Sequence, residues 1–117
     1  MQSDFESLKV WQHSMILVEE VYSLSKTFPK EEQYSLTSQL HRAVVSIPAN
    51  IAEGKGRNSK KEFIQFLSIA KGSAYESITL IKISQRLGYL PPDKTEYPLT
   101  LLSEIIAMLN GLIRSIH

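Results

Sequence analysis

The chain has 117 residues, of which 43% are apolar and 21% charged, so its length and composition match one globular domain with one hydrophobic core. Thirteen basic and twelve acidic side chains leave a net charge of +1, and this total alone implies no polyanionic partner. The absence of cysteine excludes thiol catalysis, disulfides and cysteine-ligated zinc, and favours the reducing cytoplasm. Residues 1–6 lack the layout of a secretion signal, and no uninterrupted apolar run approaches the ~20 residues of a membrane-spanning helix. We therefore expect one cytoplasmic domain, residues 1–117, that makes no contact with a membrane.

The first predicted helix covers about residues 7–27 and carries apolar side chains on two stripes with helical spacing. One stripe consists of Leu8, Trp11, Met15, Val18 and Tyr22, and the other of Val10, Leu17, Val21, Leu24 and Phe28. A peripheral helix of a monomer needs to bury only one such face, so the extra stripe predicts a contact between subunits. Pro29 ends the helix, because a residue before proline is pushed out of the α region.

The second predicted helix covers about residues 31–53 and contains a proline. Its apolar row consists of Leu36, Leu40, Val44, Ile47 and Ile51. Pro48 removes one backbone donor, but the pattern resumes after it, so we predict a kink at Pro48 rather than a break. Gly54 and Gly56 mark the end of the helix.

The third and fourth predicted helices cover about residues 59–87 and 95–116. Ser59 followed by Glu62 has the spacing of a capping box at the start of the third helix, and Gly88 ends it. The fourth helix has apolar residues at alternating steps of three and four, which is the pattern of a coiled-coil-like seam. Four long amphipathic segments with short links predict an all-α fold, an up-and-down antiparallel four-helix bundle.

A row of polar residues lies on one face of the second helix, opposite the apolar row. It consists of Gln39, Arg42, Ser46, Asn50 and Glu53. The third helix carries a similar stretch with Ser73 and Glu76, so a bidentate pair between Arg42 and Glu76 would join the two helices. Three interpretations stay open: a solvated outer face, a polar network inside the bundle, and a ligand site.

The clearest charge cluster lies between the second and third helices. It consists of Lys55, Arg57, Lys60 and Lys61, four cations within seven residues. The glycines beside it lack the spacing of a Walker loop, which disfavours nucleotide binding. A basic link that leads into a helix N-terminus suits phosphate, and an oligomer would repeat this patch in every subunit.

No catalytic or metal-binding pattern is present. The three histidines form no HExxH or Glu-x-x-His pair, and the only aspartates, Asp4 and Asp93, lie in a tail and a link, so neither a metal, a cofactor nor a catalytic triad is expected. Tyr34, Tyr75 and Tyr89 would stack on bases if exposed, although tyrosines are more often packing residues.

Four segments of the chain together resemble a known family. They are SQLHRAVVSIPANIAEG at 38–54, LKVW at 8–11, FLSIAKGS at 66–73 and MLNGL at 108–112, and Phe28, Pro29 and Glu76 belong with them. This set resembles the bacterial 23S ribosomal RNA intervening-sequence proteins, which are related to the accessory protein of diversity-generating retroelements. The resemblance implies a four-helix subunit, a ring-like homopentamer and an association with nucleic acid. Because this chain is nearly neutral, we expect its affinity to be modest and sensitive to salt.

Three functional hypotheses follow. The first is a non-enzymatic homo-oligomer that binds structured nucleic acid, with RNA favoured over DNA, through Lys55, Arg57, Lys60 and Lys61, and with Arg42 and Lys71 as secondary candidates. The second is an oligomeric scaffold or adaptor whose partner is another protein. The third, an enzyme, requires Glu53, Glu76 and His41 to converge in one cavity.

Overall fold

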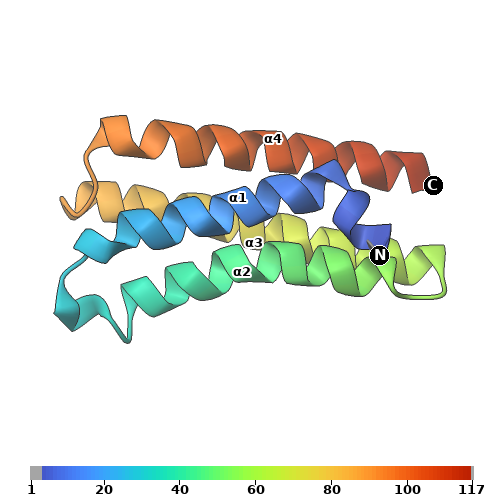
Figure 1. Cartoon of the computed structure of the whole chain (residues 1–117), viewed down its shortest axis with the longest axis horizontal. Helices are drawn as coiled ribbons and strands as arrows, with labels where there is room; N and C mark the ends of the chain where they lie inside the picture. Colours follow the sequence, from blue (N-terminus) through green and yellow to red (C-terminus); the bar gives the residue numbers. More distant parts are fainter. Residues whose placement is uncertain (1–3, 117) are drawn as a thin grey trace.

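Four helices run up and down along one long axis, with each link joining neighbouring ends (Figure 1). The computed structural model describes residues 4–116, so residues 1–3 of the polar N-terminal segment and His117 lie outside the described part. The helices are α1 (Lys9–Leu24), α2 (Leu36–Lys55), α3 (Lys60–Arg86) and α4 (Pro92–Ile116). Short 3-10 turns cover Asp4–Ser7, Ser25–Thr27 and Lys30–Glu32. The predicted all-α four-helix bundle is confirmed.

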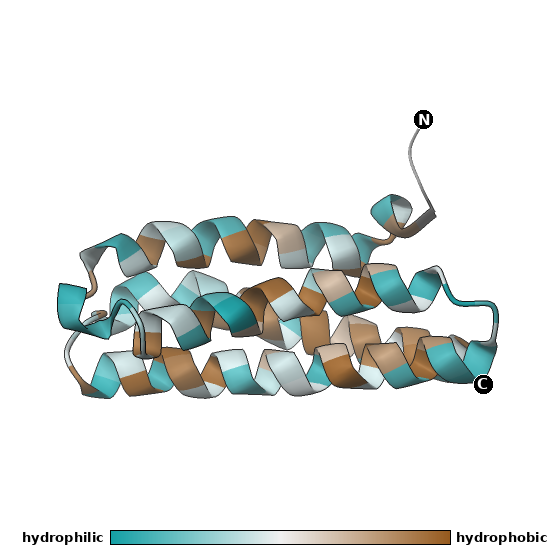
Figure 2. Ribbon diagram, turned by 90° about the horizontal axis from the view of Figure 1, so that it is seen from below, coloured by the Kyte–Doolittle hydropathy of each residue, from teal (hydrophilic) through white to brown (hydrophobic). Residues whose placement is uncertain are grey.

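Each helix packs on two neighbours, in the order α1, α2, α3, α4 and back to α1. The apolar row of α2 and one of the two stripes of α1 point into the shared core, where Leu17, Val44 and Ile47 have no exposed surface. Figure 2 shows the corresponding alternation of hydrophobic and hydrophilic bands along each helix. The helical period of the apolar residues therefore determines which side of each helix is buried.

The structure differs from the sequence expectation at the start of α2, which begins at Leu36 rather than near residue 31. Residues Lys30–Glu32 form a separate 3-10 turn after Pro29, and Ser35 leaves the helical region with φ −126° and ψ −98°. One oxygen of Glu32, Oε1, accepts hydrogen bonds from the Ser35 hydroxyl (2.7 Å) and from the Leu36 amide (3.4 Å). Glu32 thus caps α2 from outside the helix.

Pro48 within α2 and Pro92 at the start of α4 affect their helices differently. α2 passes through Pro48 without a break, and the predicted kink there stays a prediction. α4 begins at Pro92, three residues earlier than the sequence pattern suggests, because a proline at the first helical position loses no hydrogen bond and has the right φ.

The end of α3 shows why a glycine stands at position 88. Gly88 has φ +81°, a left-handed conformation that suits glycine. The Gly88 amide donates to the Gln85 carbonyl (3.0 Å) and the Tyr89 amide donates to the Ser84 carbonyl (2.9 Å), which is the Schellman pattern. The link to α4 can therefore be short and fixed.

The hydroxyl of Tyr89 donates to Oε2 of Glu32 (2.9 Å) and so ties the α3–α4 link to the cap of α2. Hydrogen bonds from Ser35 and then Tyr89 lower the pKa of Glu32 below its usual 4.5, and the bond to Glu32 raises the pKa of Tyr89 above 10.0. A lowered carboxyl pKa stabilises the fold above 4.5 and loses that effect as the pH falls. The raised tyrosine pKa stabilises it below 10.0 and loses that effect at higher pH.

Tyr89→Phe is therefore expected to lower the unfolding temperature between about pH 5 and 9, with a difference from the wild type that shrinks below pH 4.5. The ring keeps its contact with Phe28, 5.6 Å away between centroids, so packing is preserved. Thermal unfolding across pH 3 to 9 measures the difference. Tyr97→Phe, at an exposed tyrosine of α4, is the matched control. A difference that stays constant down to pH 3 would contradict the role given to the Glu32 carboxylate.

Helix α4 is long and apolar enough to cross a membrane by length and composition alone. Its most apolar 18-residue window has a mean hydropathy of 1.5, and 22% of that window is buried. The expectation from uninterrupted apolar runs missed this, because polar residues such as Glu104, Asn110 and Arg114 divide the runs while the leucines and isoleucines between them keep the average high. Core helices of bundles meet the same condition, and Leu102, Ile105 and Leu109 of α4 are fully buried against the other helices.

Candidate nucleic-acid interface

The link between α2 and α3 gathers the four clustered cations at one end of the bundle (Figure 1). Lys55 is the last residue of α2, Arg57 lies in the link, and Lys60 and Lys61 are the first two residues of α3. All four side chains are exposed. We call these four residues the basic turn.

Arg57 is the best-fixed member of the basic turn. Its Nη2 lies 2.8 Å from Oε2 of Glu53 and its Nη1 lies 3.9 Å from Oε2 of Glu62. Its guanidinium carbon lies 4.9 Å from the ring centroid of Phe66. Exposed ion pairs contribute at most ~1 kcal/mol, so these contacts orient Arg57 more than they stabilise the fold. They also offset part of its charge.

The lysines of the basic turn are the cations open to a ligand. Lys60 and Lys61 form no salt bridge within residues 4–116. They stand in the first turn of α3, where the helix dipole disfavours a cation by about 0.3–1 kcal/mol. Lys55 Nζ lies 5.6 Å from the ring centroid of Phe63. The Ser59 hydroxyl accepts from the Glu62 amide (3.1 Å), which is the half of the predicted capping box that fixes the start of α3.

Gly54, near the end of α2, allows α3 to pack very close to α2. A Cβ atom at this position would lie 2.6 Å from Cβ of Phe66 and 3.1 Å from Cδ1 of Phe63. Because Cβ of Phe66 is fixed to the backbone of α3, it cannot move away without moving the helix. Gly54 thus sets the distance between the two helices beside the basic turn.

The middle of the polar row lies in the contact between α2 and α3. The hydroxyls of Ser46 and Ser73 are 2.9 Å apart, and Asn50 Nδ2 donates to the Ser46 hydroxyl (2.8 Å) and carbonyl (2.7 Å). These three side chains are half-buried. The structure therefore places Ser46, Asn50 and Ser73 in one hydrogen-bonded group.

The outer members of the row lie elsewhere. Oε2 of Glu76 accepts a hydrogen bond from Gln39 Nε2 (3.4 Å), and within residues 4–116 no salt bridge joins Glu76 to Arg42. The expected bidentate pair between Arg42 and Glu76 is thus absent from the described structure, where the packing of α3 on α2 brings Glu76 to Gln39, three residues before Arg42. Both Arg42 and Glu76 are exposed and line a groove of about 430 Å³ between α2 and α3. Glu53, the last member of the row, pairs with Arg57 at the basic turn.

The two secondary candidates do not join the basic turn. Lys71 lies eleven residues after Lys60 on α3, about 17 Å along the helix, and its Nζ donates to Oδ1 of Asn110 on α4 (3.1 Å). Arg42 lies thirteen residues before Lys55, about 20 Å along α2. Each would contact a different part of an extended ligand.

The residues required by an enzymatic interpretation do not converge. His41 and Glu53 are twelve residues apart on α2, about 18 Å along the helix. Glu76 is hydrogen-bonded to Gln39 and Glu53 is paired with Arg57. Among the described residues, no group of three histidine, aspartate or glutamate side chains is placed to hold a metal ion.

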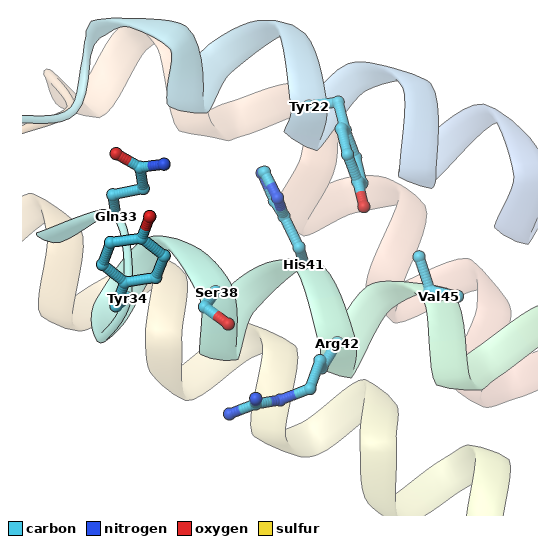
Figure 3. Close-up of a pocket in the computed structure, with 7 residues that line it drawn as sticks. All are labelled: Tyr22, Gln33, Tyr34, Ser38, His41, Arg42 and Val45. Atoms are coloured by element: carbon cyan, nitrogen blue, oxygen red, sulfur yellow. The ribbon is translucent and has the colours of Figure 1, made fainter. Parts of the chain in front are cut away.

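A hollow of about 380 Å³ lies between α1, α2 and the link that joins them (Figure 3). Its lining residues, which we call the aromatic hollow, are Tyr22, Gln33, Tyr34, Ser38, His41, Arg42 and Val45. The rings of Tyr22 and His41 stack with centroids 3.8 Å apart and planes 13° apart. Sequence reasoning considered Tyr34 and His41 singly, but no sequence signal pairs His41 with a tyrosine of another helix.

Comparisons with known proteins agree with this architecture. A protein of unknown function from the S23 ribosomal protein family of Bacteroides thetaiotaomicron has a solved structure similar to this one, with a TM-score of 0.82. The two sequences are 26% identical, and the similarity covers 90% of this chain and 95% of the other. No curated protein matches the chain.

The family model described as 23S rRNA-intervening sequence protein matches residues 6–111. The matched range takes in α1, α2 and α3 and most of α4, with the basic turn and the polar row included. The chain therefore belongs to the 23S rRNA-intervening sequence protein family.

Proposed function

We propose that this protein is a non-enzymatic, cytoplasmic protein that binds structured RNA by contacting phosphates through the basic turn. The observation that carries the proposal is the position of Lys60 and Lys61, which lie exposed and outside salt bridges in the described structure at the first turn of α3. A helix N-terminus attracts anions through its free amides and its dipole. Two lysines there raise the local positive potential, but their charge is unfavourable at a helix N-terminus and lowers the stability of the fold. A bound phosphate would offset this destabilisation.

We propose further that the chain works as a homo-oligomer, with the pentameric ring implied by its family resemblance as the expected form. Two helices at opposite corners of the bundle, α1 and α3, carry exposed apolar side chains. They are Met15 and Ile16 on α1, Ile69, Tyr75 and Ile83 on α3, and Leu87 at the C-cap of α3. Two different patches on opposite sides suit head-to-tail contacts, which form a ring when the rotation between successive subunits closes. A ring would present several basic turns to one RNA and so strengthen a weak single contact.

The test is a titration of a labelled ribosomal RNA hairpin at two salt concentrations, with the native mass recorded on the same sample. The variant Lys60→Gln with Lys61→Gln is expected to lower the affinity at least about tenfold and to reduce the slope of log K against log salt by about 1.5. Lys82→Gln with Lys94→Gln removes the same charge at the other end of the bundle and is the control.

Equal losses in both double variants would show that only total charge matters and would contradict a role of the basic turn. No binding by the wild type at low salt would favour the second candidate function, an oligomeric scaffold or adaptor for a protein partner. The exposed apolar patches on α1 and α3 would then be the first surfaces to examine.

A further inference from the structure

The aromatic hollow lies at the opposite end of α2 from the basic turn. His41 precedes Lys55 by fourteen residues, about 21 Å along the helix. The hollow receives residues from α1, from α2 and from the link between them, so it is built by the fold and not by one helix face. Its volume of about 380 Å³ lies within the ~300–1,000 Å³ that small-ligand sites occupy.

His41 presents one ring face to the hollow. The other face is covered by Tyr22, whose ring lies nearly parallel at 3.8 Å (Figure 3). Nε2 of His41 is held 2.7 Å from the hydroxyl of Ser25, which is itself buried. Burial lowers the pKa of His41 below its usual 6.5 and so favours the neutral form of the ring. The His41 ring is therefore held in place, with one face against Tyr22 and the other face open to the hollow.

The opposite wall offers a second ring and polar groups. Tyr34 is 90% exposed, and Figure 3 shows it with Gln33 across the hollow from His41. The Gln33 amide can both donate and accept, and the Ser38 hydroxyl lies at the floor between the two walls. A planar heteroaromatic group with donors and acceptors on its edge matches these walls.

Arg42, at the rim of the aromatic hollow, is a cation that can bind a phosphate. Arg42 is exposed, forms no salt bridge within residues 4–116, and lines both the aromatic hollow and the groove beside α3. A guanidinium binds phosphate oxygens with two donors at once. Aromatic faces, an amide and one arginine together are the groups that bind a nucleotide unit of a single strand.

We infer that the aromatic hollow binds one unpaired nucleobase of an RNA strand, with the adjoining phosphate at Arg42. This inference rests on the proposed RNA-binding function and adds to it. The basic turn contacts phosphates whatever the sequence, whereas the hollow requires a base that is not paired. RNA with an unpaired segment should therefore bind more tightly than a blunt duplex of the same charge.

The experiment uses an RNA hairpin with a single-stranded tail that carries the fluorescent base 2-aminopurine, and a blunt duplex for comparison. Stacking in the hollow is expected to quench the tail fluorescence on binding. Tyr34→Ala removes one of the two stacking rings and is expected to reduce the quenching and to weaken tailed-RNA binding by about five- to a hundredfold, while duplex binding stays unchanged. Tyr97→Ala, at an exposed tyrosine of α4, is the control, and thermal unfolding checks that both variants fold.

The outcomes separate the two proposals. Salt-dependent duplex binding without quenching in the tail would overturn the inference and leave the proposed function standing. Quenching that depends on Tyr34 in a protein that does not bind duplex would support the hollow and refute the role of the basic turn in duplex binding. Adenosine monophosphate that binds as tightly as the tailed RNA would assign the hollow to free nucleotides and overturn the inference of a strand site.

Discussion

Replacing Gly54 with alanine is expected to lower the free energy of unfolding by about 1–3 kcal/mol, which is the usual effect of overpacking. An alanine in a helix is normally favoured over glycine by about 1 kcal/mol, so the expected sign is the reverse of the helix propensity. The reason is the 2.6 Å approach that the new Cβ would make to Cβ of Phe66. Urea unfolding followed by circular dichroism measures the change.

Gly72→Ala is the matched control for this prediction. Gly72 lies within α3, is exposed, and has no atom within 4 Å of the position that a Cβ would take. The same chemical change is therefore expected to stabilise the protein by about 0.5–1 kcal/mol. If both variants shift stability in the same direction, the close approach of α2 and α3 at Gly54 is not what determines the effect.

Leu102→Ala is expected to cost about 2–5 kcal/mol, the largest single effect predicted for this chain. Leu102 has no exposed surface and lies in the seam of α4, among buried residues contributed by all four helices. Truncation would leave a cavity that a close-packed bundle cannot refill without moving a helix. Thr100→Ala, two residues away on the exposed side of α4, is the control and is expected to change stability by less than about 0.5 kcal/mol. A Leu102→Ala variant as stable as the control would contradict the packing of α4 in the core.

The helices were predictable because their periodic apolar residues determine which side is buried. The ends were less predictable where a side chain outside the helix decides them. Glu32 caps α2 through the Ser35 hydroxyl and the Leu36 amide, and no spacing rule for helix starts includes that arrangement. Ser59, by contrast, follows the usual capping rule, and α3 starts at Lys60, one residue from the expected position.

The candidate sites show a similar division. Periodicity identifies residues that share one helix face, as in the row that includes Ser46 and Asn50. It does not set how far α3 is shifted along α2, and this shift decides that Glu76 meets Gln39 rather than Arg42. The stacking of His41 on Tyr22 depends in the same way on the relative position of α1 and α2. Contacts between helices require the packed structure, whereas contacts within a helix can be read from spacing.

The up-and-down order of the helices has a consequence for folding kinetics. α1 with α2, α2 with α3, and α3 with α4 are neighbours in both sequence and space, so each of these pairs can form by closing a short loop. Among the four described helices, α1 and α4 pack together although they lie near opposite ends of the chain. Chains dominated by such local contacts fold within microseconds to milliseconds. We therefore expect this chain to fold rapidly. The docking of α1 against α4 is expected to be the step with the largest loss of loop-closure entropy.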